Sequence, residues 1–250
     1  MNKKVSHSLS NGIATLSFYD EKSNSLPGST LKAIADSITL LGKDNDVKVI
    51  ILKSEGDRAF CAGASFDELI AIDTPENGKK FFMGFANVIN AMRLCPKFII
   101  GRVQGKAVGG GVGLASSVDY CLATKFASVK LSELAIGIGP FVVGPAVQRK
   151  LGLPGMSELA INASEFKDAN WASENGLYQE VFASVDELDL AIKELSERLS
   201  KFNPEAMAEL KKNFWKGCEN WDQLLSERAA MSGKLVLSEF TRNAIAKFKQ

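Results

Sequence analysis

The residues whose types and spacing could do chemistry gather in one stretch of the sequence, Val103–Gly139. Three consecutive glycines, Gly109 to Gly111, follow a β-rich apolar run and precede an apolar run with helical spacing. Glycine lets a ligand approach the backbone closely, and the first turn of a helix has N–H groups without intrahelical partners. We interpret this junction as one half of an oxyanion site, in which backbone amides stabilise a negatively charged oxygen.

An acid follows these glycines at a distance that could bring it to the same site. Glu133 stands about twenty residues further on, among apolar neighbours. Desolvation raises the pKa of a carboxyl group toward neutrality, which suits a group that takes up and returns a proton. Two alternatives remain open: Glu133 could begin a helix with its carboxylate in water, and the glycines could serve only to pack a helix against a sheet.

A second junction of small residues, Cys61–Ala64, lies after an earlier apolar strand, and a helix is predicted from Ser65. Asp67 and Glu68 then fall in its first turn, where the helix dipole favours acids. The glycine cluster does not match a nucleotide-binding loop, because a P-loop requires Gly-Lys-Ser/Thr where this chain has Val112–Leu114. Asp119, which follows the helix predicted after Gly111, is interpreted as a cap or as an acid that positions a strand.

The composition is that of a globular protein with one large domain, or with a domain and a small appendage. The chain has 250 residues, of which 46% are hydrophobic and 24% charged, and its net charge of +1 gives no sign of a nucleic-acid surface or a basic membrane face. Four cysteines show no metal-binding spacing, and we expect reduced, buried thiols. A lone histidine, His7, argues against a Ser–His–Asp triad and against a metal site.

The N-terminal residues lack the apolar region of a signal peptide. The most apolar window, Leu134–Val147, is interrupted by glycines and prolines and is too short to span a bilayer. We therefore expect a cytoplasmic protein without a membrane-spanning segment.

Strand and helix patterns alternate along the first two thirds of the chain, which predicts an α/β fold with a parallel or mixed sheet. Predicted strands are 12–18, 47–52, 98–103, 128–131 and 177–182. Predicted helices are 31–41, a run from 65, 81–94, a run after 111, 146–151, 155–162, 168–174, a run from 186, a run from 204, and 221–248. Ser29 or Thr30 could cap the first of these helices.

Five segments, in this order, resemble motifs of the enoyl-CoA hydratase/isomerase (crotonase) superfamily. They are Asn24–Leu26, Phe60–Ser65, Gln104–Gly111, Leu131–Leu134 with Gly137, and Ala169–Phe182. The resemblance implies a crotonase-like fold of stacked ββα units over residues 1–190, which carries an acyl-CoA site. It also implies a helical C-terminal region over residues 191–250 that drives assembly into a homotrimer or hexamer.

The resemblance further implies an acyl-CoA thioester as substrate, with no separate cofactor, since CoA is part of the substrate. The backbone N–H groups of Ala62 and Gly110 would form the oxyanion hole, and Glu133 would be the catalytic acid and base. The candidate substrate- and CoA-binding residues are Lys22, Ala64, Gly109, Phe248 and Lys249. The two lysines among them are the candidates for the CoA phosphates.

The chain departs from the family pattern where hydratases usually carry a first glutamate, because that position is Gly113. Ser65 replaces the aspartate of the earlier motif, and Asp67 stands where a basic residue is often found. A single carboxylate favours enoyl-CoA double-bond isomerisation, with Glu133 moving a proton from C2 to C4. A hydratase with one glutamate, a non-catalytic acyl-CoA-binding protein, and a decarboxylase or thioesterase of the same fold remain alternatives, and chain length, pathway and trimer against hexamer stay open.

Overall fold

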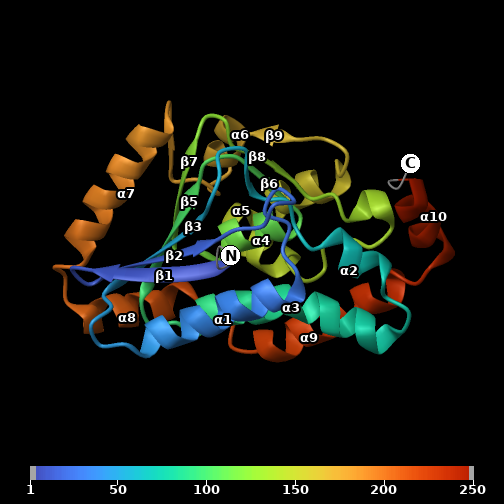
Figure 1. Cartoon of the computed structure of the whole chain (residues 1–250), viewed down its shortest axis with the longest axis horizontal. Coiled ribbons are helices and arrows are strands. Elements are labelled where there is room, and N and C mark those ends of the chain that lie inside the picture. The colour runs from blue at the N-terminus through green and yellow to red at the C-terminus, as the bar shows by residue number, and fades with distance from the viewer. Residues whose placement is uncertain (1–3, 248–250) are drawn as a thin grey trace.

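The computed structural model describes residues 4–247, which fold into two sheets enclosed by helices (Figure 1). The larger sheet has the strand order β1-β2-β3-β5-β7-β10. Its strands are β1 (Val5–Ser10), β2 (Ile13–Phe18), β3 (Val49–Ser54), β5 (Phe98–Val103), β7 (Tyr120–Thr124) and β10 (Glu180–Phe182). Neighbours from β2 to β10 are parallel, and β1 is antiparallel to β2 at the edge.

The smaller sheet has the order β4-β6-β8-β9 and carries both small-residue junctions. Its strands are β4 (Ala59–Cys61), β6 (Lys106–Val108), β8 (Ser128–Lys130) and β9 (Lys167–Asp168). Strands β4, β6 and β8 are parallel, so the chain leaves each of them at the same end of the sheet. The segments that follow these three strands contain Ala64, Gly110 and Glu133, so the topology brings the three predicted site segments to one edge.

The helices connect the strands and form a C-terminal group. The first group is α1 (Gly28–Lys43), α2 (Phe66–Ile70), α3 (Pro75–Leu94), α4 (Gly110–Ser117), the 3₁₀ turn η1 (Leu134–Ile136), α5 (Gly144–Ile161) and α6 (Ala169–Glu174). The C-terminal group is α7 (Val185–Leu199), α8 (Pro204–Phe214), α9 (Trp221–Leu235) and α10 (Glu239–Lys247). Within α5, Gly152 has non-helical dihedral angles (φ 72°, ψ 172°), which separates the two predicted helical segments.

Both faces of the larger sheet are covered, which explains why β5 is buried at every residue. Leu188 and Ile192 of α7 pack on one face, against Val49, Ile100 and Leu122. The main core lies on the other side and includes apolar residues of α1, α3, α4 and α5. In Figure 1, α7 stands apart on the left, whereas α1, α3 and α9 run together below the sheets. This arrangement of strands and helices confirms the predicted α/β fold.

The C-terminal helices pack closely on the body of the chain. A Cβ atom built on Gly78 of α3 would lie only 2.7 Å from the Cα of Gly233 in α9, so the two helix backbones touch at this point. Helix α8 is joined to the core by a buried ion pair, 2.7 Å long, between Lys211 and Asp119. The proposed division into residues 1–190 and 191–250 stays a prediction, and its limit lies inside α7.

Several features differ from the sequence predictions, which did not include strands β4, β6, β7 and β9. Strand β1 was not predicted, because only its first residue is even partly buried and its apolar signal is weak. Helix α3 begins at Pro75, six residues earlier than predicted, because Thr74 caps it, accepting a hydrogen bond from Asn77 N at 3.2 Å. The single helix predicted over 221–248 is wrong: α9 ends at Leu235, and α10 starts at Glu239.

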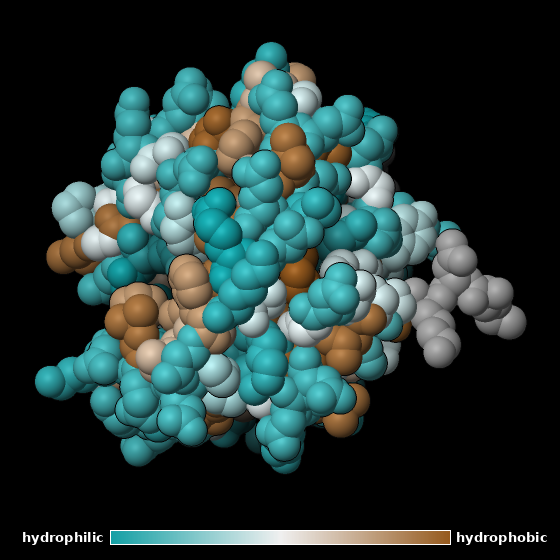
Figure 2. All heavy atoms as spheres, turned by 90° about the vertical axis from the view of Figure 1, so that its left-hand side faces the viewer, coloured by the Kyte–Doolittle hydropathy of each residue, from teal (hydrophilic) through white to brown (hydrophobic). Residues whose placement is uncertain are grey.

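Charged and polar side chains cover most of the face that carries α7 in Figure 1. Figure 2 shows this face with hydrophilic residues predominating and hydrophobic residues emerging in several separate groups. All four cysteines are buried free thiols, as predicted. Within residues 4–247, no helix combines the length and the hydropathy that a bilayer crossing requires.

Candidate active site

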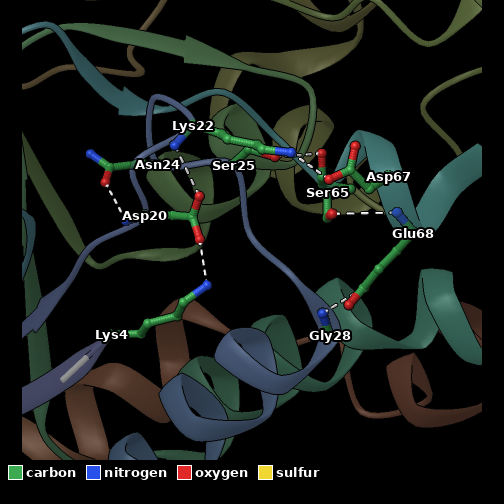
Figure 3. A network of polar contacts seen from close by, with 10 residues as sticks. Lys4, Asp20, Lys22, Asn24, Ser25, Gly28, Ser65, Asp67 and Glu68 are labelled. Atoms are coloured by element: carbon green, nitrogen blue, oxygen red, sulfur yellow. Dashed lines mark hydrogen bonds and ion pairs between the residues drawn. The ribbon is translucent and has the colours of Figure 1, made fainter. Parts of the chain in front are cut away.

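The segment between β2 and α1 holds the first junction in place through a network of polar contacts (Figure 3). The buried Asn24 side chain donates from Nδ2 to the carbonyls of Glu55 and Ala59, both at 2.9 Å, and accepts from the Asp20 amide at 2.9 Å. Glu68, which follows β4, accepts from Gly28 N at 2.8 Å. This carboxylate occupies the capping position of α1, so the prediction that Ser29 or Thr30 would cap that helix is wrong.

The same segment decides which amides of the first junction remain available. Ala62 N donates to Ser23 O at 3.2 Å, Leu26 N donates to Gly63 O at 2.8 Å, and Ser65 N donates to Leu26 O at 3.0 Å. The amide of Ala64 lies between these paired groups and donates to no other residue of the described chain. The prediction that Ala62 supplies the oxyanion donor is therefore corrected: its N–H group is occupied, and the available one belongs to Ala64.

The second junction also leaves an amide available. Gly109 has a positive φ of 52°, a conformation that favours glycine, and its N–H donates to Lys130 O at 2.8 Å. Gly110 is the first residue of α4, and its amide donates to no other residue between 4 and 247. A Cβ built on Gly63 would lie 3.7 Å from Gly110 N, which shows that the two junctions are neighbours.

Glu133 lies beside the second junction. A Cβ built on Gly109 would lie 3.1 Å from Glu133 Oε1, so a side chain at position 109 would crowd the carboxylate. The residue as a whole is half-buried, but its Oε2 atom is buried and has no hydrogen-bond partner among the described residues. Burial raises the pKa of Glu133 to about 7, and a hydrogen bond from its own backbone lowers the pKa by a smaller amount. Such a carboxyl group can exchange protons at neutral pH.

Both junctions and Glu133 line one cavity of about 500 Å³. Aromatic and aliphatic side chains form much of its wall, including Phe66, Phe81, Phe82, Phe85, Ile138 and Phe141. Phe85 lies directly against the second junction, because a Cβ on Gly110 would come within 2.2 Å of its ring. The cavity thus combines an apolar wall with two available amides and one carboxylate, as a small-molecule site requires.

Gly113, the position of the missing first glutamate, has no free space beside it. A Cβ built there would lie 2.5 Å from Cγ1 and 2.8 Å from Cβ of Val143. Val143 is itself buried and lines the cavity. The place where a second carboxylate would start is therefore filled by an apolar side chain.

Only some of the predicted CoA-binding residues line the cavity. Ala64 and Gly109 line the cavity. Lys22 does not line it: its ammonium forms an ion pair with Asp67 at the surface, so the lysine already has a counter-ion (Figure 3). Phe248 and Lys249 lie outside the described residues. Ser65, which replaces an aspartate, is buried and caps α2, accepting from Glu68 N at 3.4 Å.

Sequence reasoning missed Lys130 as a residue of the cavity and did not single out Val143 for its contact with Gly113. Lys130 is the last residue of β8, and it lines the cavity together with Ser132 and Ser164. Strand alternation alone could not show which face Lys130 is on, because β8 has only three residues. Val143 is one of several apolar residues in a Gly- and Pro-rich segment, and only its contact with Gly113 distinguishes it.

Taken together, the fold and the cavity define a class of proteins with a crotonase-like fold, in which small-residue junctions of parallel strands meet beside a buried acid. The enoyl-CoA hydratase/isomerase family model matches residues 8–248, and the chain belongs to this family.

Different relatives of the chain are named for different activities. The chain is 28% identical to a short-chain-enoyl-CoA hydratase of Clostridium acetobutylicum, over 90% of this chain and 86% of the relative. It is 27% identical to a peroxisomal Delta(3,5)-Delta(2,4)-dienoyl-CoA isomerase of Arabidopsis thaliana, over 84% of this chain and 80% of the relative. A crystal structure of an enoyl-CoA hydratase from Bacillus halodurans superposes with a TM-score of 0.91, at 18% identity, covering 98% of this chain and all (100%) of that one.

Proposed function

We propose that the protein is an enoyl-CoA double-bond isomerase that works through a single carboxylate. The observation that carries this proposal is the pairing of a buried, unsolvated Glu133 oxygen with two available amides in one cavity. The amides of Ala64 and Gly110 would donate to the thioester oxygen, and Glu133 would stand beside the carbons next to it. Removing one such donor typically costs roughly 3–4 kcal/mol in the barrier.

In the forward direction, Glu133 removes a proton from C2 of a 3-enoyl thioester. The C–H electron pair forms a C1–C2 double bond, and the thioester oxygen gains the negative charge that the two amides stabilise. The electrons then return through C2 and C3, which places the double bond between these carbons, and C4 takes the proton from the Glu133 carboxyl group. Proton and charge balance without another reactant. A pKa of about 7 lets the same group act as base and then as acid.

Hydration is the second candidate, and the hydratase relatives favour it. It requires a water molecule to be activated as well as a proton to be delivered, whereas Gly113 has no side chain and Val143 fills the space beside it. The apolar contact between these residues favours isomerisation. The site residues, a cytoplasmic location and assembly into a homotrimer or hexamer remain part of the proposal.

The test is to assay purified protein with 3-hexenoyl-CoA and with 2-hexenoyl-CoA, following the absorbance of the conjugated thioester. We expect isomerisation to exceed hydration in the wild-type protein. Glu133→Gln should reduce isomerisation by roughly 10²- to 10⁴-fold. Binding of saturated hexanoyl-CoA is the control and should persist in this variant. Hydration at enzyme-like rates that survives Glu133→Gln would refute the role given to Glu133.

A further inference from the structure

Lys130 is the one cationic residue in the lining of the cavity, as far as the described residues show, and Glu133 is the one anionic residue. The backbone of Lys130 is in direct contact with the second junction, because its carbonyl accepts the hydrogen bond from Gly109 N at 2.8 Å. Its side chain therefore begins next to the place proposed for the thioester. A cationic residue in the lining of the cavity needs an explanation that the isomerisation step does not supply.

A second lysine lies close to the first. Val108 pairs with Lys130 across parallel strands, and Lys106 is two residues before Val108, so all three side chains are on one face of the smaller sheet. The ammonium groups of Lys106 and Lys130 lie 5.1 and 4.4 Å from the centroid of the Phe166 ring. Two like charges are thus held near a single aromatic ring.

Neither ammonium is neutralised within the described part of the chain. Among residues 4–247, Lys106 and Lys130 have no ion pair, whereas Lys167 of the neighbouring strand β9 is paired with Glu158 at 2.5 Å. Two unpaired cations repel each other, and an anion placed between them would relieve that repulsion. Ser132 and Ser164 also line the cavity and offer hydroxyl donors to such an anion.

We propose that Lys130, assisted by Lys106, binds a carboxylate at the far end of the acyl group, so that the substrates are acyl-CoA thioesters with a second, terminal acid. This inference rests on the proposed acyl-CoA function and specifies its substrate class. The phosphates of CoA are the other source of negative charge. They are separated from the thioester by the long pantetheine arm, whereas Lys130 starts beside the junction proposed for the thioester, which favours the acyl carboxylate.

Calorimetric titration with saturated, unreactive thioesters tests this inference separately from catalysis. The ligand pairs are glutaryl-CoA against pentanoyl-CoA and adipoyl-CoA against hexanoyl-CoA, which differ only by the terminal carboxylate, with free CoA as reference. The wild-type protein should bind the carboxylate-bearing member of at least one pair roughly tenfold more tightly. Lys130→Gln should abolish this preference, and Lys106→Gln should reduce it.

Lys125→Gln provides a matched control, because the ammonium of Lys125 lies 5.2 Å from the centroid of Phe126 but the residue does not line the cavity. This variant should retain the full preference. Equal affinity within both ligand pairs would overturn the inference. So would an equal loss of affinity for free CoA and for every thioester in Lys130→Gln, because Lys130 would then serve the CoA phosphates. Failure of all thioesters to bind would refute the acyl-CoA function itself, whereas a carboxylate preference without isomerase activity would leave the subsite standing.

Discussion

Val143 occupies the space that any side chain at position 113 would need. The Cγ1 atom of Val143 would be 2.5 Å from a Cβ on Gly113, well inside van der Waals contact. A change of rotamer would move Cγ1 but not the Cβ of Val143, which would lie 2.8 Å from the same atom, so the clash would persist. The absence of a carboxylate at 113 and the presence of valine at 143 are therefore one coupled feature of the cavity wall.

This coupling predicts non-additive stabilities. Gly113→Ala alone should destabilise the protein by about 1–3 kcal/mol through overpacking, and Val143→Ala alone by a similar amount through a cavity. In the double variant the clash with Cγ1 disappears and only the 2.8 Å approach between the two Cβ atoms remains, and alanine also favours the α4 helix. We expect the double variant to be at least about 1 kcal/mol more stable than the sum of the single effects, measured by urea unfolding. Strict additivity would contradict the contact.

The same feature predicts how hydration could be introduced. Gly113→Glu alone should be poorly folded, because its Cβ meets Val143. Gly113→Glu combined with Val143→Ala removes the 2.5 Å clash with Cγ1 and leaves only the 2.8 Å approach to Cβ, which a small shift of α4 would relieve. The carboxylate can then reach the cavity wall and activate a water molecule. Hydration of 2-hexenoyl-CoA should then rise by roughly 10²-fold or more above the wild-type rate. Val143→Ala alone is the control for the enlarged cavity, and an equal gain in that variant would show that the carboxylate is not the cause.

Replacing single backbone amides by esters tests which of them serves the site. An ester at residue 64 removes an N–H group that has no partner in the described chain, so the melting temperature should change little. If this N–H stabilises the enolate, kcat should fall by roughly 10²- to 10³-fold. The ester at residue 62 instead removes the 3.2 Å hydrogen bond to Ser23 O and should lower stability more than kcat. The reverse pattern would return the donor role to Ala62.

Which of these two amides, that of Ala62 or that of Ala64, is available to the site could not be predicted from the sequence. Motifs and periodicity place Gly110 and Glu133 in adjoining loops, and the structure brings both into one cavity. Whether Ala62 or Ala64 points an amide into that cavity depends on tertiary pairing with residues 23–26, which accept from the amides of Ala62 and Ser65 but not from that of Ala64. A shift of one residue in that pairing would reverse the assignment, and the sequence contains no signal for the register.

The C-terminal helices illustrate a different limit. Strands β3 and β5 were predicted because both faces of the larger sheet are buried and these strands are mostly apolar, whereas the neighbouring β7 was not predicted. The break between α9 and α10 falls at 236–238, a segment without glycine or proline. It is marked by a short-range cap, in which Ser238 Oγ accepts from Thr241 N at 3.3 Å. A serine within a helical pattern is too common a feature to predict such a break.

Breaking the buried ion pair that joins α8 to the sheets should lower the free energy of unfolding by several kcal/mol, which is about the effect of leaving one buried charge without its partner. Lys211 and Asp119 are 2% and 4% exposed, and Asp119 also accepts from Ile99 N at 2.8 Å. Lys211→Met leaves the carboxylate buried without its cation, and we expect a loss of about 3–5 kcal/mol in the free energy of unfolding. Adding Asp119→Asn to this variant should restore part of the loss, because the uncompensated charge disappears. A loss below about 1 kcal/mol would show that water replaces the lysine.

The raised pKa of Glu133 has opposite consequences for activity and for stability. The group is a base only when ionised, so kcat/KM should rise with pH through about 7 and then level off. Between about pH 4.5 and 7 the folded protein holds a proton on Glu133 that the unfolded chain releases. The free energy of unfolding therefore falls as pH rises through this window, because the folded state binds more protons than the unfolded state.

Glu133→Gln removes both effects while keeping the shape of the side chain. Its unfolding free energy should lack the Glu133 contribution to the pH dependence, and above pH 7 the variant should be more stable than the wild-type protein by about 1–3 kcal/mol, since no charge is then buried. Denaturant unfolding at several pH values between 4.5 and 8.5 measures the difference. A variant that is less stable than the wild type at pH 8 would mean that the Glu133 carboxylate has a stabilising partner in the folded protein. Desolvation would then not be what makes Glu133 a suitable base.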